Sequence, residues 1–464
     1  MLAANTRRLL SFGIWILFSI GSLSWWEKLS VLTPEDYPIW WPPTSASFNG
    51  SWMFFALIFT SLSLLYVLEL TDNRPAKLKQ ILFWVFILGL GAILVFPFGS
   101  KDIFTYVSFT RLHAFYGLNP HLATASDIYN YLYDPFLKNT YHNTVVSPYG
   151  PLWTWLSYGL YHIAAGFGLI PFILSFKALG LLMHLLITMM VYKVAEIIAQ
   201  GSGARAALIY GMNPLALFEL VANAHNDGPA ILLLLLSIFF VIQKRPLKGF
   251  TALGAAVSFK FTIMLTVPIF IWRAVRERGQ FLAVQGAVIF ALITAFSYLF
   301  FKVSFLDVIQ TSTGGILNIS FASLAYALAG ENIVPFARAA GLSIFLLWYY
   351  VLLRKINKEN LETLNITIGL CFLAYFLFGA YMVHRWYYLW PLAVTVTSPN
   401  HPWAKAVVIQ TIIILPCYTL MLAFGEVNID KSITYILSLL PVLTIGLLQY
   451  RRSLKNRGFL TSHL

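Results

Sequence analysis

The chain has 464 residues, of which 59% are hydrophobic and only 11% are charged. Soluble globular proteins carry about 25% charged residues, so this composition excludes the soluble class and favours a membrane protein. The net charge of +13 does not predict nucleic-acid binding, because Lys and Arg gather in loops between apolar runs. Cys371 and Cys417 lie inside apolar runs, so we expect neither a disulfide framework nor a CxxC metal site.

Successive apolar runs approach the length of about 20 residues with which a helix crosses the hydrocarbon of a bilayer. The first run follows Arg7 and Arg8 as in a signal peptide, but no small-residue cleavage site follows Trp26, so we interpret it as an uncleaved span. The expected spans cover 9–25, 51–70, 80–98, 172–194, 206–222, 229–243, 281–301, 334–353, 362–380, 387–399, 404–423 and 432–450.

The distribution of Lys and Arg predicts how these spans are oriented. With the N-terminus in the cytoplasm, 21 of the 31 basic residues fall in cytoplasmic positions and seven in external ones. The sequence therefore predicts a multi-pass protein of the cell membrane with both termini in the cytoplasm.

The stretch 151–170, PLWTWLSYGLYHIAAGFGLI, is apolar enough to cross the membrane. A span here would place Arg205 and the cluster from Lys244 to Lys248 outside, against the positive-inside rule. We therefore predict an amphipathic helix along the external surface, a position that suits its Trp and Tyr residues.

The segment 249–272 has basic residues on both flanks, so both flanks should be cytoplasmic. A re-entrant hairpin of two short helices that turns near Lys260 meets this condition, and it requires a cavity or a protein surface around the turn. We thus predict an all-α polytopic bundle of about 12 transmembrane helices plus this hairpin. It forms one domain over 1–464, with a large external loop, about 99–170, after the third span.

The external stretch 99–150 is rich in Tyr, His, Asn and Asp and is too long for a simple connection. Three residues separate Asp102 from the end of the third span, a position where a partly desolvated carboxylate could act as a general base. The alternative is that Ser100 or Asp102 only caps a helix over 103–115.

The stretch NAHNDG, 223–228, falls at the external end of the fifth span, on the same side as Asp102. It is either a turn that caps the next helix or part of a site. Glu219 favours a site, because a carboxylate inside a span is a functional candidate. Asp227, His225 and Glu219 could together hold a divalent cation or bind sugar hydroxyls.

Cations accompany these carboxylates. Lys260 either snorkels to the interface or serves an anionic group in the cavity. His384 and Arg385 occur at an external helix end in YMVHRWYYLWPL, where Arg385 could bind a phosphate bidentately and Trp386 belongs to an interfacial aromatic belt. Two further cations near external helix ends, Lys177 and Arg338, are weaker candidates for this role, and we expect them to snorkel.

Carboxylates suit the activation of a hydroxyl, and cations suit a phosphate at headgroup depth. A lipid-linked phosphosugar that meets an acceptor hydroxyl needs both. The sequence has no Walker motif and no Gly-rich nucleotide loop, so a nucleotide-sugar donor is not expected.

Five stretches resemble, in order, the GT-C superfamily of integral-membrane glycosyltransferases, and in particular the bacterial polyprenol-phosphate-mannose-dependent α-1,6-mannosyltransferases. They are SKDIFTYVSFTRLHAFYGLNPH, SPYGPLWTWL, NPLALFELVANAHNDGPAILLLLL, VSFKFTIMLTVPIFI and HRWYYLWPL, within about 100–392. The resemblance implies inverting transfer of a hexose, expected to be mannose, from a polyprenyl-phosphate sugar. The acceptor would be a hydroxyl of a glycan or glycolipid at the external face of the bilayer.

The resemblance also implies site residues, with Asp102 as the general base. The residues that would line the cavity are His225, Asn226, Asp227, Lys260, Arg385 and Trp386. The chain departs from the family pattern after Asp102, where Ile103 and Phe104 replace Val and Tyr and His121 follows Asn-Pro. These departures bear on the identity of the sugar and the acceptor.

In the expected mechanism the donor phosphate lies near Lys260 and Arg385, and Asp102 takes the proton of the attacking hydroxyl. Tyr149 shapes the floor of the loop, and Glu219 is counted among the substrate-binding residues. No cofactor is expected beyond the candidate divalent cation. Two alternatives remain: a transporter or flippase for a lipid-linked sugar, with charges in a central cavity, and an acyltransferase that uses His225.

Overall fold

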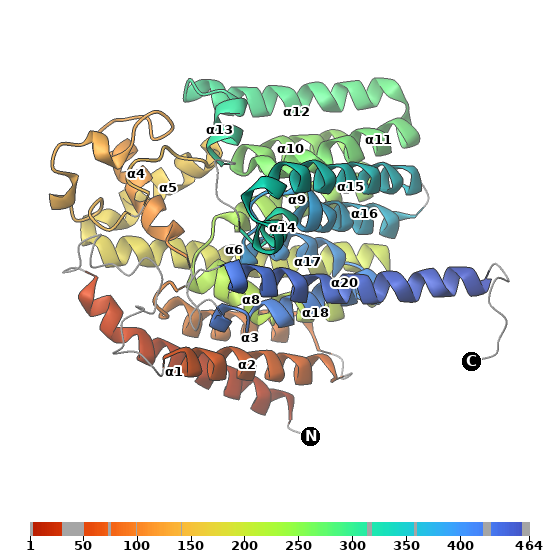
Figure 1. Cartoon of the computed structure of the whole chain (residues 1–464), viewed down its shortest axis with the longest axis horizontal. Helices are drawn as coiled ribbons and strands as arrows, with labels where there is room; N and C mark the ends of the chain where they lie inside the picture. The colour runs from red at the N-terminus through yellow and green to blue at the C-terminus, as the bar shows by residue number, and fades with distance from the viewer. Residues whose placement is uncertain are drawn as a thin grey trace.

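The computed structural model describes residues 3–29, 51–72, 76–98, 100–140, 142–312, 318–356, 360–420 and 428–456 (Figure 1). These parts are helical or connect helices, and the one β-type pairing among them is an isolated bridge between Asn318 and Met382. The predicted all-α class is therefore confirmed.

Seven helical stretches in the described residues are long and apolar enough to cross a membrane. They expose large apolar side chains such as Leu57, Phe296 and Leu347, as expected of helices that face lipid. They belong to α2 (Ser51–Leu70), α6 (Leu169–Ile198), α12 (Gln280–Phe300), α15 (Val334–Lys355), α16 (Leu361–Ala374) with the π-helix η8 (Tyr375–Gly379), α18 (Pro402–Ile414) and α20 (Asn428–Asn456).

Other helices complete this bundle. The first predicted span lies within α1 (Ala4–Lys28), and two shorter apolar helices are α3 (Leu78–Ile93) and α9 (Asp227–Ile242). The chain between α12 and α15 contains α13 (Phe305–Ser312), α14 (Phe321–Ala329) and the 3₁₀ helix η7 (Glu331–Ile333).

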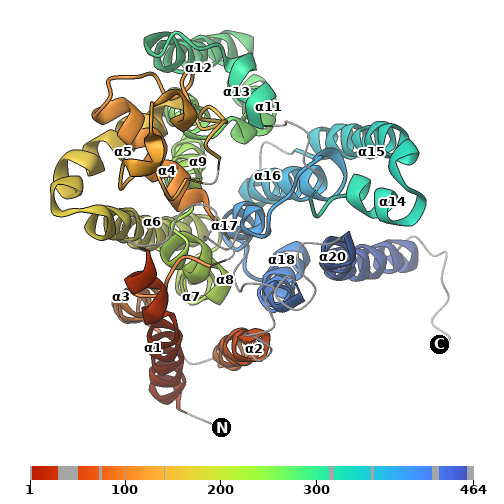
Figure 2. The same cartoon turned by 60° about the vertical axis from the view of Figure 1, so that its left-hand side comes forward.

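One end of the bundle, hereafter the loop end, carries the segment between α3 and α6 (Figures 1 and 2). It contains α4 (Asp102–Ala114), α5 (Pro151–Ala164) and the 3₁₀ helices η2 (Ala125–Asp127), η3 (Tyr131–Tyr133) and η4 (Ala165–Phe167). The segment is ordered around Arg111, whose Nε lies 2.9 Å from Oδ2 of Asp134 and whose guanidinium also bonds the Tyr161 hydroxyl.

The opposite end of the bundle gathers basic residues that the sequence places on one side. Arg7 bonds Glu69 and Asp72 at the end of α2, at 3.1 and 2.6 Å. Arg205 donates to the backbone carbonyl of Leu70 at this same point. Because Arg205 and Arg7 share one end of the bundle, 151–170 is not a span, in agreement with the predicted surface helix.

The predicted single span over 206–222 is wrong in form, because three short helices replace it. They are α7 (Gly203–Gly211), α8 (Pro214–Leu217) and the π-helix η5 (Phe218–Ala222). Pro214 has no backbone N–H to continue α7, and the Asn213 side chain caps α8 by accepting from the backbone N–H of Ala216 at 3.1 Å.

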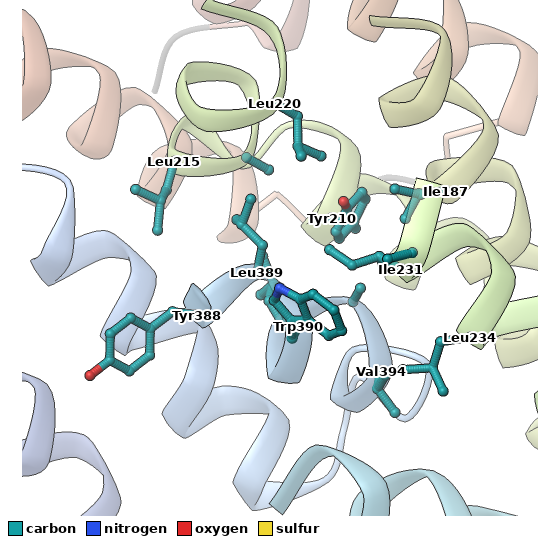
Figure 3. Close-up of a cluster of buried hydrophobic side chains, with 14 of the residues drawn as sticks. Ile187, Tyr210, Leu215, Leu220, Ile231, Leu234, Tyr388, Leu389, Trp390 and Val394 are labelled. Atoms are coloured by element: carbon teal, nitrogen blue, oxygen red, sulfur yellow. The ribbon is translucent and has the colours of Figure 1, made fainter. Parts of the chain in front are cut away.

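The predicted span over 387–399 is also wrong. The chain forms a 3₁₀ helix, η9 (Arg385–Tyr388), and then α17 (Leu389–Thr395), a buried helix of seven residues that is too short to cross a membrane. Figure 3 shows Leu389 and Trp390 of this segment in the buried core, among Tyr210 and Ile231 of α7 and α9.

The predicted turn near Lys260 is confirmed. It lies between α10 (Pro246–Phe259) and the 3₁₀ helix η6 (Phe261–Thr266), which leads into α11 (Val267–Arg278). The turn reaches the loop end, because the Gly150 backbone N–H donates to the Phe259 carbonyl at 3.1 Å. A Cβ at Gly150 would fall 2.1 Å from the Ser258 carbonyl oxygen, so only glycine permits this approach.

The third predicted span, 80–98, ends early, since α3 stops at Ile93. Lys177 of α6 explains this end: its fully buried Nζ donates to the carbonyl of Ile93 at 3.1 Å and to that of Val95. The predicted snorkelling of Lys177 is therefore wrong, because its ammonium satisfies carbonyls that a helix end leaves unpaired.

Candidate active site

A sharp reversal of the chain shapes the stretch 223–228. Ala224 has φ +55°, a left-handed conformation that costs energy for a residue with a Cβ. The reversal lets the His225 backbone N–H donate to the Glu219 carbonyl at 2.9 Å. It also places Asp227 at the first position of α9, where a carboxylate is favoured by the helix dipole. His225 and Asp227 therefore both come from one constrained turn.

Asp102 is the first residue of α4, but its side chain does not cap the helix. The hydroxyl of Ser100 accepts the Asp102 backbone N–H at 3.2 Å. The carboxylate instead accepts from the Tyr106 hydroxyl at 3.4 Å and lies 3.5 Å from Nδ1 of His225. The structure thus brings α4 and the turn before α9 together. The sequence predicted that both lie on the same side of the membrane.

His225 lies between two carboxylates. Its Nε2 is 3.3 Å from Oε2 of Glu219, and its Nδ1 faces Asp102. The Asn223 amide donates to Oε2 of Glu219 at 2.9 Å, and the Tyr418 hydroxyl donates to Oε1. Glu219 and His225 have no exposed side-chain surface, whereas the Asp102 side chain is 22% exposed.

This arrangement shifts the protonation equilibria of the turn and the loop. Burial lowers the pKa of His225, but the Asp102 and Glu219 carboxylates more than offset burial and raise that pKa to about 9. Burial alone would raise the pKa of Asp102, yet the adjacent His225 imidazolium holds that pKa well below its usual range. At neutral pH the pair is therefore an imidazolium next to a carboxylate.

Asp227 forms a second buried pair beside the first. Its Oδ2 lies 2.6 Å from Nζ of Lys260, and its Oδ1 accepts from the Trp390 indole N–H at 2.6 Å. Lys260 also donates to Oδ1 of Asn226 at 3.1 Å. The Tyr106 hydroxyl, which accepts the Asn226 backbone N–H at 3.3 Å, links this pair to Asp102.

Trp386 is enclosed by two imidazole rings and is not free to stack on a sugar. Its ring centroid lies 3.7 Å from that of His225 and 4.2 Å from that of His384, with interplanar angles of 19° and 7°. Two rings this close and parallel to one ring must cover its opposite faces. Its indole N–H and the Asn226 amide nitrogen are buried without a hydrogen-bond partner among the described residues, so they could donate to a ligand.

Arg385 is positioned by the last helix. Its Nη2 lies 2.9 and 3.1 Å from the two oxygens of the buried Asp430 and 3.4 Å from the Thr434 hydroxyl of α20. Its guanidinium also lies over the Tyr418 ring at 4.8 Å. The structure therefore gives Arg385 a carboxylate partner. The contact of Arg385 with a phosphate stays a prediction.

Two predicted residues remain, Tyr149 and Arg338. The Tyr149 ring packs edge-on against Tyr106, with centroids 5.1 Å apart, and so lies beside Asp102. Arg338 is exposed, with its guanidinium 4.1 Å from the centroid of the Tyr381 ring.

Four residues of the site were not identified from the sequence: Tyr106, Trp390, Tyr418 and Asp430. The first could have been found, because a side chain four residues after Asp102 lies on the same face of a helix.

The described parts of the chain contain no group of side chains that is arranged to bind the predicted divalent cation. No cluster of three or more His, Cys, Asp or Glu side chains there has metal-binding geometry. Asp227 instead bonds Lys260 and Trp390, and both nitrogens of His225 face carboxylates. The cation stays a prediction, which chelation can test.

Comparison with known proteins gives two curated relatives that have the same name. Residues aligned with alpha-(1->6)-mannopyranosyltransferase A of Corynebacterium glutamicum are 23% identical over 154 residues, 32% of this chain and 31% of the relative. The protein of the same name from Mycobacterium tuberculosis is 25% identical over 222 residues, 41% of this chain and 42% of the relative. The chain thus matches less than half of the length of either relative.

The family model described as "Alpha-(1->6)-mannopyranosyltransferase, N-terminal domain" matches residues 14–276. This match includes Asp102, Glu219, His225, Asp227 and Lys260, and it covers more than half of the 464 residues. The chain therefore belongs to this mannopyranosyltransferase family.

Proposed function

We propose that the protein is a membrane mannosyltransferase that moves mannose from a polyprenyl-phosphate sugar to an acceptor hydroxyl of a glycan or glycolipid. Transfer takes place at the external face of the cell membrane and inverts the anomeric centre, with Asp102 as the general base. Membership of the mannopyranosyltransferase family supports the transferred sugar. The positive-inside distribution of Lys and Arg supports an external loop end and cytoplasmic termini.

One observation carries the assignment of the base. Asp102, Glu219 and Asp227 all lie at the loop end, but only the Asp102 carboxylate is accessible, at 22% exposure against 0% for the other two. A general base must come within hydrogen-bond reach of the proton that it removes. The 22% exposure of the Asp102 side chain is consistent with this requirement.

The chemistry follows from the charges next to Asp102. The Asp102 carboxylate accepts the proton of the acceptor hydroxyl while the acceptor oxygen attacks the anomeric carbon. The bond between this carbon and the phosphate oxygen breaks, and its electron pair leaves with the polyprenyl phosphate. Lys260, which keeps 11% exposure, is the cation best placed to stabilise that negative charge. The free N–H groups of Asn226 and Trp386 suit oxygens of the phosphate or of the sugar.

The test is transfer from radiolabelled polyprenyl-phosphate mannose in membranes that contain the wild-type or the Asp102→Asn protein. A positioned base contributes about 100-fold to 10,000-fold to a rate, so we expect kcat to fall by at least about 100-fold. Asp127→Asn is the matched control, because Asp127 is in the same loop and its carboxylate bonds only the nearby Thr124 among the described contacts. Normal transfer by Asp102→Asn would remove Asp102 from this role.

The same membranes separate the main alternative, a transporter or flippase. A flippase would move the lipid-linked sugar across the bilayer without forming a new glycosidic bond. The labelled glycan is therefore the product expected of a transferase and not of a flippase. Mass spectrometry of a deletion strain, expected to reveal a glycan shortened by one hexose, then identifies the missing product. Repeating the assay with EDTA tests the divalent cation.

A further inference from the structure

Glu219 occupies a place that substrate does not reach. Its side chain has no exposed surface, and both carboxylate oxygens are engaged within the protein. Tyr418 donates to one oxygen, while Asn223 and His225 lie 2.9 and 3.3 Å from the other. This geometry argues for a role other than the substrate contact that the sequence suggested.

His225 connects Glu219 to Asp102. Its two ring nitrogens flank Cε1 and point in different directions: Nε2 lies 3.3 Å from Glu219, and Nδ1 lies 3.5 Å from Asp102. Stacking on Trp386 at 3.7 Å prevents the ring from turning out of this line. The three side chains form a connected series that begins in the core and ends at the exposed carboxylate.

We propose that Glu219 is a positioning residue, which orients His225 and through it holds the Asp102 carboxylate toward the acceptor hydroxyl. This inference rests on the proposed function and adds a residue to it. Glu219 takes no part in bond making: the hydroxyl proton goes to Asp102, the new bond joins the acceptor oxygen to the anomeric carbon, and the phosphate leaves with the electron pair. Glu219 and His225 keep their atoms and their charges throughout.

The physical reason is the cost of burying charge. A carboxylate with no exposed surface is very unfavourable unless it is paired and hydrogen-bonded. Glu219 satisfies this requirement with His225, Tyr418 and Asn223. With Gln at position 219, His225 would have one carboxylate partner in place of two, and nothing charged would hold its Nε2 edge. Asp102 would then lose a fixed partner, although its own chemistry is unchanged.

The test compares kcat and KM of Glu219→Gln with the wild-type protein, per amount of folded protein. We expect kcat to fall about tenfold, a part of the contribution that a positioned base makes. KM for donor and for acceptor should stay within about twofold, since a residue that does not touch substrate does not contribute to ground-state binding. A rise in KM with unchanged kcat would overturn the proposal and return Glu219 to substrate binding.

A double-mutant cycle separates this proposal from the proposed function. If Glu219 acts through Asp102, adding Glu219→Gln to Asp102→Asn should not lower the residual kcat further. A further tenfold loss in the double variant would overturn the positioning role. An Asp102→Asn protein with full activity would instead overturn the proposed base, whatever Glu219→Gln does.

Two more variants distinguish a loss of positioning from a loss of folding stability. Tyr418→Phe keeps both carboxylates and removes only the hydroxyl that bonds Glu219, so kcat should fall a few-fold with KM unchanged. Glu69→Gln is the matched control, because Glu69 is also a buried glutamate that bonds cations, Arg7 and Arg8, but at the opposite end of the bundle. It should lower stability and leave kcat of the folded protein unchanged. Wild-type kcat in both Glu219→Gln and Tyr418→Phe would overturn the inference.

Discussion

Lys260 and Asp227 are 33 residues apart in the chain, yet Nζ of the lysine lies 2.6 Å from Oδ2 of the aspartate. This ion pair joins the turn after α10 to the first residue of α9 at the loop end of the bundle. Because Asp227 is fully buried and Lys260 nearly so, each needs the other.

Replacing Lys260 should therefore affect stability and activity separately. Lys260→Gln leaves the Asp227 charge buried without its cation, which costs about 3–5 kcal/mol of folding stability. The double variant Lys260→Gln with Asp227→Asn should recover much of this stability, measured as the melting temperature in detergent. It should not recover mannosyl transfer, because the cation proposed to stabilise the leaving phosphate is still absent. Recovered transfer would contradict that role.

Activity should decline at alkaline pH. The pKa of His225 is raised to about 9, so its proton is present at neutral pH and is lost as the pH rises through about 9. The Asp102 pKa is held below its usual range, so Asp102 itself stays ionised from pH 5 upward. A profile of kcat/KM from pH 5 to 10 should show a decline with an apparent pKa near 9. An unchanged rate up to pH 10 would contradict a role for the imidazolium.

Gly180 of α6 should be needed for the π-helix that carries Glu219. A Cβ at this position would fall 1.8 Å from the backbone carbonyl oxygen of Leu220, so an alanine would have to push η5 away. We expect Gly180→Ala to lower both the melting temperature and kcat. Gly159→Ala in α5 is the control, because its Cβ would meet open space and alanine favours a helix by about 0.5–1 kcal/mol. Equal effects of the two variants would contradict this packing.

The orientation can be tested by cysteine labelling, because the two native cysteines are buried. Tyr129 in the loop end is 92% exposed, so Tyr129→Cys should react with a membrane-impermeant maleimide added to intact cells. Arg278 at the end of α11 is exposed in a predicted cytoplasmic position, so Arg278→Cys should react only after permeabilisation. The reverse pattern would place the loop end in the cytoplasm.

Much of the candidate site could be predicted from the sequence because polar residues are conspicuous in apolar surroundings. Asp102, His225 and Asp227 follow the ends of apolar runs, and the charge distribution put them on one side of the membrane. In the structure Asp102 Oδ2 and His225 Nδ1 lie 3.5 Å apart. Their partners were harder to predict, because Trp390 and Tyr418 look like ordinary aromatic residues of an apolar stretch. Trp390 lies in the buried helix α17, and Tyr418 follows α18.

The helix breaks could not be predicted from hydropathy. The stretches 206–222 and 387–399 are apolar enough to span, but they fold as short helices inside the protein. Their backbone is protected by neighbouring helices such as α6 and α9, so it need not form one continuous helix as lipid-exposed backbone must. Hydropathy measures the cost of leaving water, and it is the same for a side chain that faces lipid and one that faces protein.

The sequence by itself determined the membrane class and the helical composition, and it predicts the side of the membrane on which the acids gather. These properties depend on the apolar content of each segment and on which loops contain Lys and Arg. The bilayer acts as a solvent on each segment separately, so distant parts of the chain do not change them. Only the tertiary structure decided which charge meets which: Lys177 with the end of α3, Arg385 with Asp430, and Glu219 with His225. A buried charge is stabilised by whatever group the fold brings within about 3 Å, and that partner can lie anywhere along the chain.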